Sequence, residues 1–209
     1  IGEHVELFNG EGGSYLATLT SISKKQVNAE VKVFLPEEVE LPFNLSLAQA
    51  LPEASKMDWI IEKAIELGVN HIQPLAAQRS VVKLNPERAE KKMQHWQGII
   101  QSATEQCGRK RIAHLAELID VQKWLMQQDM HKRILLSPRA DQSLSDWTRH
   151  HPAQALTIMI GPEGGFSDSE EQLAIKQGAI MLSMGPRVLR TETAGLTAIS
   201  VISAAWGGM

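Results

Sequence analysis

The sequence predicts an α/β fold in which a small N-terminal β domain precedes a parallel sheet covered by helices. The stretch from Ala155 to Trp206 contains two successive strand–loop–helix units, each with a short apolar strand ahead of its loop. A strand–helix–strand unit earlier in the chain implies the same parallel arrangement. We therefore expect the two later loops at the carboxyl ends of neighbouring parallel strands, the edge where open α/β sheets bind ligands.

The N-terminal segment is predicted to be all-β, with short strands separated by turn residues. Asn9-Gly10 with Gly12-Gly13, and later Lys24-Lys25-Gln26, mark two turns. The predicted strands are His4 to Phe8, Tyr15 to Ile22 and Val27 to Leu35. The stretch from Pro36 to Pro42 is typical of a linker, so we expect domains of residues 1–43 and 44–209.

The first half of the second domain is predicted to alternate strands with helices. The strands are Leu45 to Leu51 and Val69 to Leu75. Between them a helix begins at Ser55, with Asp58 as its capping-box partner, and ends at Gly68. Asn85-Pro86 begins a long helix, because proline is tolerated at the first helical position, and Gly108 ends it.

The second half continues the same alternation. The predicted strands are Ile112 to Leu118, Arg133 to Ser137, Leu156 to Ile160 and Ala179 to Met184. The predicted helices are Val121 to Gln128, Leu144 to His150 and Thr193 to Trp206. One further helix begins at Ser167, with Glu170 closing a capping box, and ends at Gly178.

The amino-acid composition limits which classes of protein this chain can belong to. Hydrophobic residues at 43% and charged residues at 22% of 209 describe a globular chain with a sizeable core. The longest largely apolar run, Ala194 to Trp206, is shorter than the roughly 18 residues of a membrane span, so we expect no membrane segment. A single cysteine, Cys107, excludes an internal disulfide and favours the cytoplasm. No His, Cys or carboxylate set has metal-ligand spacing, so we predict no metal.

Two loops contain the residues best suited to bind a ligand or to take part in catalysis. In Gly161-Pro162-Glu163-Gly164-Gly165 the proline fixes one backbone angle and the glycines permit close approach of another molecule. A tight strand-to-helix connection explains this loop equally well. The residues of the loop do not match a Walker loop or a dinucleotide-binding fingerprint, and Gly161-Pro162-Glu163 excludes a nucleophile elbow. The second loop places Arg187, Arg190 and Glu192 between an apolar strand and an apolar helix. Charges in such surroundings are costly unless they are paired or used.

Taken together, the segments Ile160 to Phe166 and Met184 to Ala194 resemble the RsmE family. These are SPOUT-class RNA methyltransferases that use S-adenosylmethionine to methylate N3 of a uridine in 16S ribosomal RNA. Lys56 to Gly68 and Glu105 to Arg109 extend the resemblance through nearly the whole chain. It implies a C-terminal trefoil knot, a PUA-like N-terminal β domain, a homodimer and the small ribosomal subunit as partner. RsmE-like proteins carry more residues before this point, so the β domain looks truncated.

The resemblance also implies which residues hold S-adenosylmethionine. Three loops would form a snug apolar slot with main-chain hydrogen bonds for the adenine. The implied residues are Leu136, Ser137, Pro138, Gly161, Pro162, Glu163, Gly164, Gly165, Met184, Gly185, Val188, Leu189, Thr193 and Ala194.

The reaction requires that N3 of uridine lose its proton before it attacks the methyl group. Arg190 is a candidate to stabilise the developing negative charge or to grip a phosphate. Glu192 or Glu163 is a candidate to accept the proton or to hold that arginine. An Arg–Glu pair that only stitches the loop together stays open as the alternative.

A net charge of −3 argues mildly against nucleic-acid binding, but the distribution of charge matters more. The basic residues expected to contact RNA are Arg79, Lys83, Arg109, Lys110, Arg111, Arg139 and Arg187. A solvated surface explains the same residues without RNA. Two other functions also stay open: a SPOUT methyltransferase acting on another RNA site, and a noncatalytic RNA-binding or ribosome-associated module.

Overall fold

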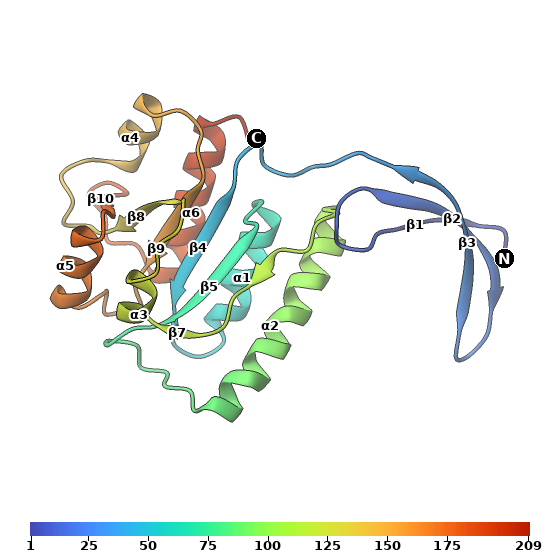
Figure 1. Cartoon of the computed structure of the whole chain (residues 1–209), viewed down its shortest axis with the longest axis horizontal. Coiled ribbons are helices and arrows are strands. Elements are labelled where there is room, and N and C mark those ends of the chain that lie inside the picture. The colour runs from blue at the N-terminus through green and yellow to red at the C-terminus, as the bar shows by residue number, and fades with distance from the viewer.

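The computed structural model describes all 209 residues and arranges them around two separate sheets. The smaller sheet is antiparallel, in the order β1-β2-β3, and stands away from the rest of the molecule at the N-terminal end (Figure 1). Its strands are β1 (His4–Leu7), β2 (Ser14–Ile22) and β3 (Val27–Leu35). This confirms the prediction of three short antiparallel strands before the linker.

The larger sheet is wholly parallel. Its strands are β4 (Leu45–Ala50), β5 (His71–Ala76), β6 (His114–Leu115), β7 (Ile119–Asp120), β8 (Lys132–Leu136), β9 (Leu156–Ile160) and β10 (Ile180–Leu182). They lie in the order β10-β8-β9-β4-β5-β6, with β7 also beside β5. The expectation that the last two strands are neighbours is wrong, because β8 pairs with both β9 and β10 and lies between them. Since every pairing is parallel, their loops still share one edge of the sheet.

Helices cover both faces of this sheet. Those on the first face are α1 (Lys56–Glu66), α2 (Pro86–Cys107), α4 (Leu144–His150) and α6 (Thr191–Ala205), and they enclose the main core of 25 buried residues. Those on the second face are α3 (Val121–Leu125) and α5 (Asp168–Lys176), over a cluster of 12. Strand β4 contributes side chains to both cores, because Leu47 lies in the first and Ala48 in the second. No helix of the chain combines the length and apolarity needed to traverse a bilayer.

Several helix ends follow the capping residues predicted from the sequence. Ser167 and Glu170 form a complete capping box at the start of α5. The Asn85 side chain accepts a hydrogen bond from the Arg88 N–H at the start of α2, ahead of a proline at the first position. Gly108 ends α2 in the left-handed conformation, with φ of 79°. Local sequence therefore determines where these two helices begin and where α2 ends.

The first helix of the second domain begins after Ser55 as predicted, but its predicted capping box is absent, and the predicted start of the last helix is wrong. Ser55 makes no side-chain capping bond, and Asp58 instead accepts a 2.9 Å hydrogen bond from the Trp96 indole of α2. The Asp58 carboxylate therefore links α1 to α2 instead of capping the start of α1. The last helix begins at Thr191, two residues before the predicted start, with Arg190 at its N-cap.

A joint of charged side chains links the small sheet to the segment after α2. The Gly12 N–H donates to the Lys110 carbonyl at 3.1 Å. The side chain of Lys110 forms an ion pair with Glu6, and that of Arg111 forms one with Glu38 at 2.9 Å. These two cations, predicted to contact RNA, therefore have acidic partners within the chain.

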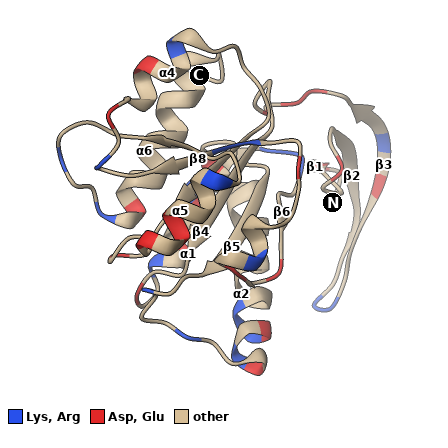
Figure 2. Cartoon of the chain, turned by 60° about the vertical axis from the view of Figure 1, so that its left-hand side comes forward, with Lys and Arg blue, Asp and Glu red and all other residues tan.

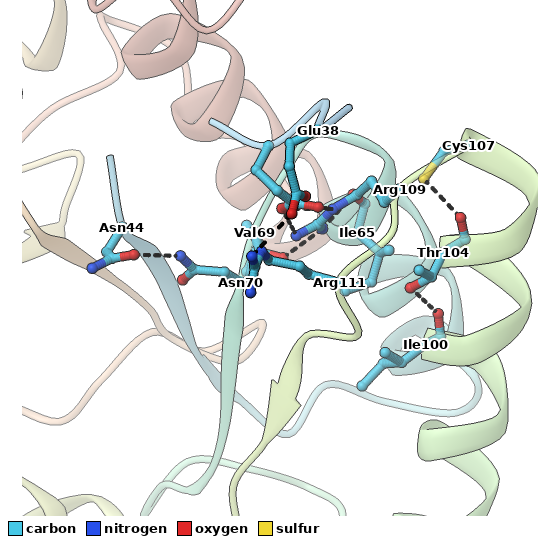
Figure 3. Close-up of polar contacts among 11 residues, drawn as sticks. Glu38, Asn44, Ile65, Val69, Asn70, Ile100, Thr104, Cys107, Arg109 and Arg111 are labelled. Carbon is cyan, nitrogen blue, oxygen red and sulfur yellow. Dashed lines mark hydrogen bonds and ion pairs between the residues drawn. The ribbon is translucent and has the colours of Figure 1, made fainter. Parts of the chain in front are cut away.

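Arg109 lies at the centre of this joint and is only 3% exposed. Its guanidinium binds the Glu40 carboxylate. It also donates to the carbonyls of Ile65 at 2.9 Å and Val69 at 2.8 Å (Figure 3). The prediction that Arg109 contacts RNA is therefore wrong, because the side chain is buried and its donors are used within the chain. A buried charge of this kind is tolerated only when it is fully paired.

Replacing Arg109 with alanine is predicted to destabilise the chain by about 3–5 kcal/mol, because it leaves Glu40 and two carbonyls without their partner. The matched control is Arg111→Ala, which removes a half-exposed pair of about 1 kcal/mol or less. Urea unfolding measures both variants. Equal losses in the two would contradict the assignment of Arg109 as the buried anchor of the joint.

Candidate functional site

A cavity of about 520 Å³ opens at the carboxyl edge of the large sheet, within the usual range for small-molecule sites. The loops that follow β8, β9 and β10 form most of its wall. Its lining includes thirteen of the fourteen residues predicted to hold the cofactor: Leu136, Ser137, Pro138, Gly161, Pro162, Glu163, Gly164, Gly165, Met184, Gly185, Val188, Leu189 and Ala194. The parallel topology thus brings together three segments that are far apart in the sequence.

Thr193 is the one predicted cofactor residue that does not line the cavity. Because α6 starts at Thr191, residues Thr191 and Ala194 lie one helical turn apart and face the cavity together. Thr193 falls off that face and is exposed. Lining residues to which the sequence assigned no role are Lys56, Ile160, Phe166, Glu171 and Thr191.

The glycine loop, Gly161–Phe166, makes a tight turn whose shape two glycines determine. A Cβ on Gly161 would lie 2.9 Å from the Phe166 nitrogen, so no side chain fits there. Gly165 has φ of 69°, and its N–H donates to the Pro162 carbonyl at 2.8 Å. Gly164 is different, because a Cβ there would make only an ordinary contact, 3.5 Å from Arg79. The fold itself therefore does not require glycine at 164.

A buried hydrogen-bond chain connects the glycine loop to the central strand and to the last helix. The Thr191 hydroxyl donates to the Gly161 carbonyl at 2.6 Å and accepts from the Gln49 side chain at 3.0 Å. Gln49 is fully buried on β4. Neither residue was assigned a role from the sequence, although a glutamine within the apolar strand Leu45–Ala50 is a signal that could have indicated a buried hydrogen-bond network.

Glu163 projects from the glycine loop toward the start of α1. It accepts a 2.6 Å hydrogen bond from the Lys56 ammonium and a 3.1 Å bond from the Glu53 N–H. Burial raises the pKa of Glu163, but the Lys56 hydrogen bond and main-chain donors outweigh it, so its pKa lies below the ordinary value. The same hydrogen bond raises the pKa of Lys56. Both groups are therefore charged at neutral pH.

The loop after β10 presents cations without partners. Arg187 and Arg190 line the cavity, are exposed and take part in no ion pair. Glu192 is half-buried and outside the lining, and one of its carboxylate oxygens is buried without a hydrogen-bond partner. The alternative of an Arg–Glu pair that stitches the loop is wrong for this geometry, because Arg190 pairs with neither carboxylate.

The remaining basic residues predicted to contact RNA do not form one patch. Figure 2 shows acidic and basic positions interleaved along the chain. Arg139 lines the cavity but pairs with Asp168 and Glu171, and Arg79 donates to main-chain carbonyls of the glycine loop. Lys83 is exposed and outside the cavity. No three His, Cys, Asp or Glu side chains are grouped to hold a metal ion.

The chain is similar to proteins of known class over its full length. Residues 39–203 match the family described as RNA methyltransferase domain, and residues 1–32 match the RNA methyltransferase PUA domain. The ribosomal RNA small subunit methyltransferase E of Bacillus subtilis (strain 168) is 34% identical, over 97% of this chain and 82% of that protein. Its counterpart from Buchnera aphidicola subsp. Acyrthosiphon pisum (strain APS) is 32% identical, over 99% and 81%.

Two crystal structures with bound S-adenosylmethionine share the fold. One is a ribosomal RNA small subunit methyltransferase E from Neisseria gonorrhoeae, with a TM-score of 0.90 and 34% identity. The other is the putative methyltransferase Lpg2936 from Legionella pneumophila, with a TM-score of 0.91 and 39% identity. Each comparison covers 98% of this chain and 84% of the other.

Replacing Thr191 with valine is predicted to lower the free energy of unfolding by about 1–3 kcal/mol, because the buried Gln49 amide and the Gly161 carbonyl lose their partner. The control is the same substitution two residues along, Thr193→Val, at an exposed position, with an expected change of about 0.5 kcal/mol or less. Chemical unfolding of both variants decides the matter. A Thr191→Val variant as stable as its control would rule out the hydrogen-bond chain.

Proposed function

The chain belongs to the family of ribosomal RNA small subunit methyltransferases E, and on that premise we propose that it methylates N3 of a uridine in small-subunit ribosomal RNA, with S-adenosylmethionine as methyl donor. The observation that carries the proposal is the cavity at the carboxyl edge, where three loops assemble nearly all the residues implied for the donor. Two relatives of the same fold have been crystallised with S-adenosylmethionine.

The cavity residues fit this donor. Leu136, Met184 and Leu189 offer apolar walls, and the glycine loop offers main-chain groups that no side chain obstructs. The donor supplies an electrophilic methyl group on a positively charged sulfonium. Glu163, ionised and paired with Lys56, places a carboxylate on the wall of the cavity.

We assign the reacting groups from their charge state and place. Arg190 lines the cavity and has no partner, so it is free to stabilise the uridine anion. Of the two carboxylates on the wall, Glu171 pairs with Arg139, and we assign Glu163, on the glycine loop, as the group that accepts the N3 proton. Its lowered pKa makes it a weak base, so most of the rate depends on Arg190. Glu192 does not line the cavity. Its negative charge contributes to the raised pKa of Lys56, so we assign Glu192 as a positioning residue.

The domain assignment, knot and assembly belong to the same proposal. Residues 1–43 form a PUA-like RNA-binding domain and residues 44–209 the methyltransferase domain, a division supported by the two family matches and by the separate sheets. A trefoil knot in the C-terminal part accords with a strand order that places β8 between β9 and β10. The homodimer uses the last helix and the loop before it, where Val188 is 82% exposed.

RNA contacts follow from the cations that remain available. Arg187 and Arg190 at the mouth of the cavity have no partner, and Lys83 is exposed on the loop after β5. Arg139 reaches RNA only if it leaves its acidic partners. The small ribosomal subunit is the partner, and the cytoplasm, where ribosomes assemble, is the location.

Replacing Gly164 with valine is predicted to weaken S-adenosylmethionine binding at least tenfold, because the added bulk crowds the glycine loop beside Arg79 where both residues line the cavity. Isothermal titration calorimetry measures the affinity. Gly98→Val, on the open face of α2, is the matched control and keeps full affinity. Undiminished affinity in Gly164→Val would contradict the loop assignment. A folded wild-type dimer that binds no donor would instead favour a noncatalytic module.

Replacing Arg190 with alanine is predicted to lower turnover about 100-fold or more while donor affinity changes little, because its charge matters most when the uridine anion forms. Single-turnover methyl transfer to ribosomal RNA measures the rate, and calorimetry measures the affinity. Arg149→Ala, on the exposed surface of α4, serves as control. An unchanged rate in Arg190→Ala would reduce Arg190 to a surface residue.

A further inference from the structure

The loop after β5 reaches across β4 to contact the glycine loop. Its contact segment is residues 77–80, which we name the supporting loop. The Arg79 guanidinium donates to the Gly164 carbonyl at 3.2 Å and to the Phe166 carbonyl at 3.1 Å. These carbonyls flank Gly165, the residue in the left-handed conformation. One side chain therefore holds both sides of the bend.

A buried carboxylate makes a second connection between the same two loops. Glu170 is 3% exposed, and one of its oxygens accepts from the Gln78 N–H at 2.8 Å. Its other oxygen accepts from the Ser167 N–H, immediately after the glycine loop, at 2.7 Å. The capping box of α5 thus uses only half of this side chain. A buried carboxylate with both oxygens occupied by main-chain donors is costly to disturb.

We propose that Glu170 and Arg79 are positioning residues for methyl-donor binding, which hold the glycine loop in its open, donor-accepting shape through the supporting loop. The inference rests on the proposed function. It replaces the role in RNA contact that the sequence predicted for Arg79. Arg79, itself part of the lining, fixes the two carbonyls on either side of Gly165, whereas Glu170 joins the Ser167 N–H at the end of the glycine loop to the Gln78 N–H of the supporting loop.

Glu170→Gln tests the carboxylate. An amide has one oxygen, so one of the two main-chain N–H groups must face another donor. We expect the dissociation constant for S-adenosylmethionine to rise about tenfold and the KM for the donor to rise with it, while kcat is largely kept. The matched control is Asp58→Asn, since Asp58 also accepts from two nitrogen donors, on Trp96 and His95, but between α1 and α2.

The control separates a positioning role from a general loss of stability. Asp58→Asn is expected to lower the melting temperature as Glu170→Gln does, and to leave donor affinity unchanged. If Glu170→Gln lowers the melting temperature but binds the donor like wild type, the proposal is overturned. If wild type itself fails to bind the donor, the proposed function fails instead, so the two failures are distinguishable.

Arg79→Ala and Arg79→Lys test the second residue. We expect alanine to weaken donor binding several-fold and lysine to restore part of it, since an ammonium can still reach one carbonyl. The salt dependence of RNA binding should stay as in wild type. A salt slope reduced by about one, with donor affinity unchanged, would show that Arg79 binds a phosphate and would overturn its assignment here.

Discussion

The site depends on one hydrogen bond, from the Thr191 hydroxyl to the Gly161 carbonyl at 2.6 Å. It joins the first residue of the last helix to the first residue of the glycine loop, and Gln49 on the central strand holds it from beneath. Two loops that follow different strands are thereby fixed to one buried point. Because an unmatched polar group in this position is costly, the arrangement has few alternatives.

The basic residues at the joint between the sheets are paired with carboxylates, whereas two arginines at the mouth of the cavity are not. At the joint between the sheets, Arg109, Lys110 and Arg111 all bind acidic partners. At the mouth of the cavity, Arg187 and Arg190 have none. A cation without a partner is available to an incoming anion, whereas a paired one must first leave its carboxylate. The net charge of the chain therefore says little about where RNA approaches.

Much of the fold could be predicted because it depends on local sequence. The bounds of β9 and α4 were predicted correctly, since each is a short run ended by its own turn or cap. The loops of the cavity could be predicted from the resemblance, since their glycines and prolines are close together in sequence. The capping box at Ser167 was likewise encoded within four residues.

What failed depends on contacts between distant residues. Nothing local places β8 between β9 and β10, buries Arg109 against Glu40, or turns Asp58 toward Trp96. Such contacts form only when the sheet assembles.

The decisive measurement is a crystal structure of this chain with S-adenosylmethionine. We expect the donor between the glycine loop, Leu136–Arg139 and Met184–Arg190, with its adenine against the apolar wall. Density for the donor at another place on the molecule, with these loops vacant, would contradict this expectation.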